Sequence, residues 1–122
     1  MLGLERGIVR LAPYCDAWPA LFAEEAARLC AALGDRIGRI EHMGSTAIPG
    51  TPAKPILDMV AAVADLDEAK ALIPKVEALG YVHRHDLDFP DRHYFVLRPE
   101  ENLSTHHLSL AEPISEFWRR QL

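Results

Sequence analysis

Apolar positions along this 122-residue chain recur with two different periods, and these predict where helices and strands lie. Over residues 17–33 they recur every three or four residues, which is typical of a helix with one apolar face. A second helical pattern covers residues 66–79, where Pro74 should kink the helix or split it in two. A last helix should begin near Ser115. Short apolar runs predict strands at residues 6–11, 37–42, 55–63, 81–85, 92–98 and 105–111.

The first helix has the most detailed sequence signals. Asp16 is the expected N-cap, and Pro19 falls in the first turn, where proline is tolerated. Gly34 marks the end of the pattern. The apolar face contains Trp18, Leu21, Phe22, Leu29, Cys30 and Leu33. We therefore expect Cys30 to be a reduced thiol in the core.

The order of the elements favours an α+β domain with a mixed β-sheet and helices packed mainly on one face. Strands alternate with helices in the first half of the chain and follow one another in the second half, which is the pattern of this fold class. The segments DLDFPD and PEENLS separate the last three strands, as in antiparallel hairpins. The length predicts a single domain over residues 1–122.

Composition and charge narrow the class of protein. Apolar residues make up 49% of the chain and charged residues 25%, as in ordinary globular proteins. The net charge of −5 argues against non-specific binding of nucleic acid, which needs a basic surface. No apolar run reaches the length of a membrane span, so we predict no membrane partner and a cytoplasmic location. Two cysteines are too few to suggest a disulfide framework.

One carboxylate interrupts the most apolar predicted strand. Asp58 lies inside the run PILDMVAAV, where an unpaired buried charge would be costly. Just upstream, Gly44, Ser45 and Thr46 form a small polar turn between two predicted strands. Backbone N–H groups and hydroxyls in such a turn can hold a phosphate, and an acid on the adjacent strand can hold the Mg²⁺ that accompanies it. The alternative is structural: an ordinary turn, and an acid that caps a helix or pairs with an arginine.

The segment EHMGSTAIPGTPAKPILDMVAAV, residues 41–63, resembles the central motif of the GrpB family. Further matches are GYVHRHD, RHYFVLRP, THHLSLAEP and SEFWRR, so the resemblance extends from about residue 8 to residue 122. That family is assigned to the nucleotidyltransferase-like superfamily. It occurs as stand-alone bacterial proteins and as a domain appended to dephospho-coenzyme A kinase. The resemblance therefore implies a nucleotidyltransferase-like sheet.

The resemblance also implies roles for individual residues. Gly44 and Ser45 match the phosphate-binding pair of the superfamily, and Asp58 matches the first of its two metal-binding acids. Asp58 and Ser45 are thus the expected catalytic residues, and Mg²⁺ is the expected cofactor. Where the superfamily places the second acid this chain has Val60, and an apolar residue there is also common among GrpB proteins. Lys54 matches the Ala-Lys-Pro of the family, as either a phosphate contact or a solvated lysine.

Histidines on two strands are candidates for the same site. Glu41 and His42 are neighbours on a strand and point to opposite faces, and we expect His42 to face the Gly-Ser turn. His107 is a candidate phosphate or base contact, or else forms a structural hydrogen bond. A zinc site formed with its neighbour His106 is disfavoured, because these two side chains also point to opposite faces.

Two charged residues further along the chain are also candidates. Arg92 matches a basic position of the family and is a candidate phosphate contact. Glu112 follows the last strand and is a candidate second metal ligand near Asp58. Each can equally be a surface or capping residue. The acids of the DLDFPD loop lack the spacing of a calcium loop, and we expect them to be solvated.

The sequence leaves two functions open. In the first, the domain transfers a nucleotidyl or phosphoryl group in a Mg²⁺-dependent reaction, with the nucleotide held between the Gly44–Ser45 turn and Asp58. In the second, it is a binding module without turnover, which binds a nucleotide, a coenzyme A precursor or another phosphorylated small molecule and acts with a partner enzyme. Val60 favours the second function, whereas the intact motif favours a ligand in both.

The C-terminal segment predicts packing against another surface. Relatives usually continue beyond SEFWRR, so we expect the chain to be C-terminally short relative to the family. A helix of about two turns is not stable without packing. We expect Phe117 or Trp118 to pack on the core or on a second copy of the chain, so a homodimer is one of two predicted arrangements.

Overall fold

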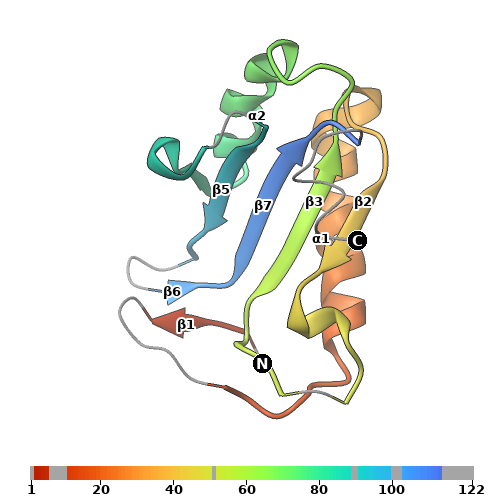
Figure 1. Cartoon of the computed structure of the whole chain (residues 1–122), viewed down its shortest axis with the longest axis vertical. Helices are drawn as coiled ribbons and strands as arrows, with labels where there is room; N and C mark the ends of the chain where they lie inside the picture. Colours follow the sequence, from red (N-terminus) through yellow and green to blue (C-terminus); the bar gives the residue numbers. More distant parts are fainter. Residues whose placement is uncertain (1, 6–10, 51, 89–90, 100–102, 114–122) are drawn as a thin grey trace.

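The computed structural model describes residues 2–5, 11–50, 52–88, 91–99 and 103–113. A five-stranded sheet has the order β2-β3-β7-β5-β4, and the short strands β1 and β6 form a separate pair (Figure 1). The strands are β1 (Leu4–Glu5), β2 (Ile40–Met43), β3 (Leu57–Ala62), β4 (Tyr81–His83), β5 (His93–Leu97), β6 (Leu103–Ser104) and β7 (His106–Ala111). In the larger sheet, β3 and β7 are parallel and the other pairs are antiparallel. The sheet is therefore mixed, and the predicted α+β class is confirmed.

The helical segments confirm the split predicted at Pro74. Helix α1 spans Trp18–Leu33, and the second helical pattern becomes a 3-10 helix, η3 (Glu68–Leu72), followed by the short α2 (Ile73–Ala78). Pro74 lies in the first turn of α2, where its missing N–H is tolerated, but it could not continue an α-helix begun at residue 68. Three further 3-10 turns are η1 (Gly34–Arg36), η2 (Ser45–Ala47) and η4 (His85–Leu87).

The described helices pack on one face of the sheet, as predicted. Figure 1 shows α1 behind β2 and β3. The core on this side joins residues of α1, η3 and α2 to every second residue of the strands; among them are Leu29, Leu33, Met59, Ala61, Leu72, Val76, Phe95, Leu108 and Leu110. Because strand side chains alternate, the other face carries Asp58, Val60, Tyr94, His107 and Ser109. We call it the Asp58 face. Its buried cluster consists of strand residues, Met43, Val60, Ala62 and Ala111.

An acid inside the buried stripe of α1 ties this helix to the edge of the sheet. Glu25 is 8% exposed, and its carboxylate receives two hydrogen bonds of 2.8 Å from Arg28 and one of 2.5 Å from the Tyr81 hydroxyl. Arg28 also donates to the Leu79 carbonyl at 2.9 Å. Burial acts to raise the pKa of Glu25, but these donors outweigh it and the pKa is lowered. The carboxylate is therefore more stable in the folded than in the unfolded chain.

Replacing Glu25 with glutamine should destabilise the fold in a pH-dependent way. At pH 7 we expect a loss of about 1–3 kcal/mol in the free energy of unfolding, because charge-assisted hydrogen bonds to a buried group are lost. The pKa of Glu25 is lowered in the folded state, so its contribution is present above the ordinary value of 4.5 and is lost as the pH falls below it. Urea unfolding at pH 7 and pH 3 measures this.

The matched control is Glu24→Gln, whose side chain is exposed on the same helix. It should change the free energy of unfolding by no more than about 0.5 kcal/mol. A difference between wild type and Glu25→Gln that is the same at both pH values would contradict the assignment.

Two predictions for α1 are wrong. Its N-cap is Ala17, without a side-chain hydrogen bond, rather than Asp16. Cys30 is exposed, not in the core. The buried stripe of the helix is narrower than its apolar pattern, and Cys30 lies about 100° around the helix axis from the buried Leu29.

Several predictions fall outside the described residues. The strand predicted at residues 6–11 lies almost wholly there, although β1 immediately precedes it. The helix from Ser115 also lies there, with Phe117 and Trp118, so packing on a second copy stays a prediction. Among the described helices, none combines the length and apolar character needed to cross a membrane.

Candidate functional site

The parallel pairing of β3 and β7 brings Asp58 and His107 together on the Asp58 face. The two residues are register partners, and His107 Nδ1 lies 3.2 Å from Asp58 Oδ1. Their side chains are 36% and 27% exposed, so both are accessible to a ligand. His106 faces the helix side, where its Nδ1 lies 2.8 Å from the Thr105 hydroxyl. The two adjacent histidines therefore have different environments, as alternation predicts.

Gly44 fits closely against the Asp58 carboxylate. Met43, the last residue of β2, pairs with Asp58, so the turn that follows passes directly over this side chain. Gly44 has φ +75°, and a Cβ atom at this position would lie 2.7 Å from Asp58 Oδ2. Only glycine combines this backbone conformation with this close approach. Ser45 begins η2 immediately afterwards, and the described part of the chain includes its backbone but not its side chain.

Tyr94 belongs to this site and was not a sequence candidate. Its ring lies 5.5 Å, centroid to centroid, from that of His107. Burial raises the pKa of the Tyr94 hydroxyl to about 12, and the charge of Asp58 adds to the effect. Tyr94 therefore keeps its proton at neutral pH. The sequence contained a signal for Tyr94, because the predicted hairpin pairs the strand RHYFVL with the strand that carries His107. The sequence alone did not show whether Tyr94 or its two strand neighbours would share the face of His107.

The predicted phosphate contact Arg92 extends the same group of side chains. Its guanidinium carbon lies 4.2 Å from the centre of the Tyr94 ring, and its Nε donates to the Leu87 carbonyl at 3.2 Å. Burial lowers the pKa of Arg92, although a guanidinium stays charged at neutral pH. The site thus combines one carboxylate, one imidazole, one phenol and one fixed cation.

His42 and Thr46 contact each other on the helix side of the turn rather than facing Asp58, and their roles as phosphate contacts stay predictions. His42 is the register partner of Met59, a helix-side residue, and stacks on Phe22 of α1 with ring centroids 4.9 Å apart. Thr46 is 2% exposed, and its hydroxyl lies 2.9 Å from His42 Nε2 and 3.4 Å from the Ile56 carbonyl. Burial lowers the pKa of His42, against the opposing effect of the Asp58 charge. Both side chains secure the turn from the other face.

Glu41, the strand neighbour of His42, is the residue on the same face of the sheet as Asp58. Glu41 pairs with Val60 across β2 and β3, so its side chain is on the Asp58 face. Glu41 and Asp58 are diagonal neighbours in this antiparallel pair, and such neighbours lie about 7–8 Å apart. The register therefore makes Glu41 the candidate for a second acid beside Asp58. Its nearest described cation is Arg39, at 3.7 Å. His42 therefore contacts the turn, as predicted, through Thr46 on the helix side, whereas the register places Glu41 on the face that carries Asp58.

Glu112 is not near Asp58, so its predicted role as a second metal ligand is wrong. It lies five residues beyond His107 on a strand parallel to β3, about 16 Å along the sheet. Its carboxylate accepts the Leu66 N–H at 2.8 Å and so secures the loop after β3. Lys54 is exposed ahead of β3, and its role stays a prediction.

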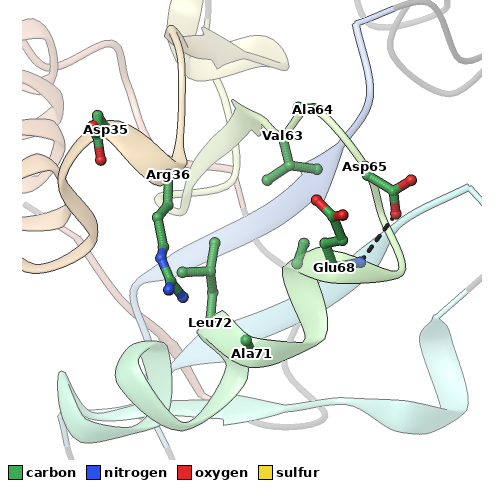
Figure 2. Close-up of a pocket in the computed structure, with 9 residues that line it drawn as sticks. Asp35, Arg36, Val63, Ala64, Asp65, Glu68, Ala71 and Leu72 are labelled. Atoms are coloured by element: carbon green, nitrogen blue, oxygen red, sulfur yellow. Dashed lines mark hydrogen bonds between the residues drawn. The ribbon is translucent and has the colours of Figure 1, made fainter.

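Two cavities lie toward the other end of the strands, and the lining of the second includes Arg92. One, of about 420 Å³, is lined by residues around the end of β3 and η3, including Arg36, Val63, Glu68 and Leu72 (Figure 2). The other, of about 430 Å³, is bounded by Asp65, Lys70, Asp88, Arg92, His93 and Glu112, among others. Asp58 lines neither of them. We place the candidate site at Asp58 because that is where the motif and the side-chain chemistry coincide.

A mixed sheet covered by helices on one face, with a Gly-Ser turn packed on a strand carboxylate, is consistent with a nucleotidyltransferase-like domain. The family model described as GrpB protein matches residues 8–122, and the chain belongs to this family. A crystal structure of the conserved protein GrpB from Enterococcus faecalis is similar, with a TM-score of 0.77 and 30% identity over 84% of this chain and 61% of that chain.

Relatives of known sequence extend the comparison. A UPF0157 protein of Halalkalibacterium halodurans is 35% identical over 80% of this chain, and the match covers 50% of that protein. The glutamate-rich protein GrpB of Alkalihalophilus pseudofirmus is 32% identical over the whole chain and 72% of its own length. A dephospho-CoA kinase of Mycolicibacterium paratuberculosis is 40% identical over 64% of this chain, which is 20% of that enzyme. The chain thus spans about half the length of the first of these proteins and a fifth of the kinase.

Proposed function

We propose that the Asp58 face binds a nucleotide or a similarly phosphorylated small molecule together with one Mg²⁺ ion. The observation that carries the proposal is the position of the Asp58 carboxylate, one oxygen against Gly44 and the other 3.2 Å from His107 Nδ1. A purely structural acid would not need a glycine packed on one oxygen while more than a third of its side chain stays exposed.

The donor set fits one magnesium ion rather than two. Mg²⁺ is usually held by one or two carboxylates and by substrate phosphates, and Asp58 supplies an accessible carboxylate. Val60 has no donor atom and is fully buried, so it cannot replace the second acid of the superfamily. Glu41 is the acid that the register leaves on this face. When bound, the ion would neutralise the phosphate charge and so favour binding and group transfer.

The other side chains would act on the bound molecule directly. Arg92 would hold a phosphate as a fixed cation, and Gly44 would let the backbone approach it closely. Tyr94 stays protonated at neutral pH, so its hydroxyl would donate to a phosphate or sugar oxygen. His107 would orient Asp58 or take a proton from an attacking hydroxyl. Ser45 and Lys54 complete the proposed phosphate contacts, as the family resemblance implies.

Two outcomes of such binding are supported by different observations. Glu41 on the Asp58 face favours nucleotidyl or phosphoryl transfer, because a second carboxylate is then within reach of the same ligand. The buried Val60 favours a binding module without turnover. The match to part of a protein named dephospho-CoA kinase makes a coenzyme A precursor one ligand to test beside ATP and other nucleotides.

The test is the change in melting temperature on adding Mg²⁺ with a nucleoside triphosphate. A ligand at 100 times its Kd stabilises the folded state by about 2.7 kcal/mol, which a thermal scan detects readily. Asp58→Asn should abolish this rise and leave the unliganded protein at least as stable as wild type, because a half-buried charge is removed. An Asp58→Asn protein that keeps the full rise would overturn the proposal.

Glu112→Gln is the matched control, because this acid lies at the far end of β7 and binds the Leu66 N–H. It should retain the ligand-dependent rise even though its own melting temperature is lower. Equal loss of the rise in both variants would mean that general charge, not the Asp58 site, determines binding.

A further inference from the structure

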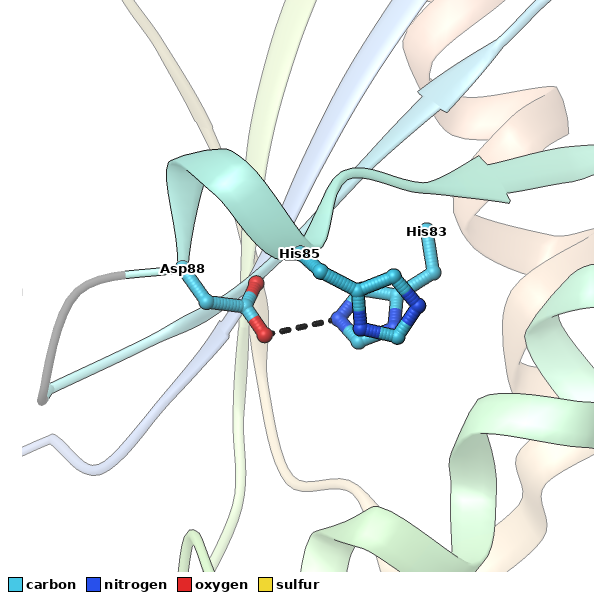
Figure 3. Close-up of side chains that lie close together, drawn as sticks. All are labelled: His83, His85 and Asp88. Carbon is cyan, nitrogen blue, oxygen red and sulfur yellow. Dashed lines mark hydrogen bonds and ion pairs between the residues drawn. The ribbon is translucent and has the colours of Figure 1, made fainter.

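A cluster of metal-binding side chains lies where β4 ends, away from the Asp58 face. His83, His85 and Asp88 each offer one donor atom, and these atoms lie within 4.8 Å of one another (Figure 3). His83 is the last residue of β4, and the single turn of η4 brings the His85 ring over it, with centroids 3.9 Å apart. The local sequence HRHDLD is therefore folded into a compact set of donors.

Asp88 is held in place rather than solvated, which corrects the sequence prediction for its loop. Its Oδ1 accepts the Tyr94 N–H at 2.6 Å, and its Oδ2 lies 2.7 Å from His83 Nε2. The side chain of His83 is 3% exposed and stacks on Phe95 with centroids 4.9 Å apart. Two of the three donors are therefore fixed by the fold, and Asp88 and His85 keep access to solvent.

One buried nitrogen of the cluster is left unpaired. His83 Nε2 lies against Asp88, but His83 Nδ1 is buried and has no hydrogen-bond partner among the described residues. Buried polar atoms in proteins are normally paired, and a bound ion is one way to satisfy such an atom. A third imidazole borders the cluster, with His93 Nδ1 3.4 Å from Asp88 Oδ2 and His93 Nε2 2.8 Å from the Leu66 carbonyl.

We propose that His83, His85 and Asp88 bind a divalent transition-metal ion, for which Zn²⁺ is the natural probe. Two imidazole nitrogens and one carboxylate oxygen form a donor set that zinc accepts, and a fourth position would be left for water or a ligand oxygen. Mg²⁺ prefers oxygen donors, so this site and the Asp58 face would select different ions. A bound ion would also join η4 to β4 and so stabilise the edge of the sheet.

The test is zinc binding by untagged protein that has been stripped with a chelator. Equilibrium dialysis with metal analysis should find one Zn²⁺ per chain, and zinc should raise the melting temperature. Co²⁺ in its place should give the visible d–d bands of a low-coordinate nitrogen and oxygen site. His85→Ala removes an exposed ligand with little risk to the fold, and binding should weaken at least 10-fold, since even partners beyond the ligands cost about 10–100-fold.

The controls separate this site from its surroundings and from the Asp58 face. His106→Gln changes a half-buried histidine outside the cluster and should bind zinc like wild type, and so should Asp58→Asn. Asp88→Asn should weaken binding as His85→Ala does. Wild type that takes up no zinc, or a His85→Ala protein that binds it equally well, would overturn the proposal. Equal weakening in His106→Gln would mean non-specific histidine binding and would overturn it too.

Discussion

Gly44→Ala should destabilise the fold by about 1–3 kcal/mol and remove the nucleotide-dependent rise in melting temperature. Two effects combine at this position. Gly44 has φ +75°, where an alanine is strained, and the new Cβ would lie 2.7 Å from Asp58 Oδ2. The carboxylate is the end of a short side chain, so it would move away from the turn and from His107. The measurements are urea unfolding and the melting temperature with and without Mg²⁺ and a nucleoside triphosphate.

Gly50→Ala separates these two effects. Gly50 has φ +80°, nearly the same backbone conformation, but a Cβ there would meet no atom within 4 Å. This variant should lose only the strain contribution, about 1–2 kcal/mol, and keep the full ligand response. If Gly44→Ala also keeps the response, the close contact between Gly44 and Asp58 has no role in binding.

Val60→Asp should destabilise the protein by about 2–5 kcal/mol in the absence of metal. Val60 is fully buried on the Asp58 face, and an aspartate there would place a second negative charge next to Asp58. The same substitution supplies the missing acid, so Mg²⁺ with a nucleotide should stabilise this variant more than wild type. Chemical unfolding with and without the ligand measures both effects. The control is Val60→Thr, which has a similar shape and no charge: it should lose less stability than Val60→Asp and gain less from Mg²⁺ with a nucleotide.

The same variant distinguishes transfer from binding alone. If the domain is a binding module, wild type should release no pyrophosphate with any acceptor, and Val60→Asp should tighten metal binding. If wild type does turn over a nucleoside triphosphate and Asp58→Asn abolishes this, the binding-module alternative is wrong. Glu41 is then the next residue to replace, because the register places it on the Asp58 face, whereas Glu112 lies about 16 Å away.

Most elements and the α+β class could be predicted from the sequence because their causes are local. Period and length distinguish helix from strand, and the missing N–H of Pro74 divides one helical pattern into η3 and α2. The conclusions about elements and class needed no knowledge of distant contacts. The family resemblance implied one site for Gly44 and Asp58, and the antiparallel pairing of β2 with β3 brings the two residues together.

Which side chains share a face was decided only by the tertiary structure. Alternation states that Glu41 and His42 point to opposite faces, but only the pairing of β2 with β3 shows which of them is beside Asp58. The register of β5 with β7 places Tyr94 on the Asp58 face. The register of β3 with β7 pairs Asp58 with His107, five residues before Glu112, and so separates Glu112 from Asp58. Cys30 and Asp88 depend on how a helix or loop is oriented against the sheet. A one-residue change of register would reverse each of these strand assignments without altering the sequence pattern, so the pattern alone could not determine them.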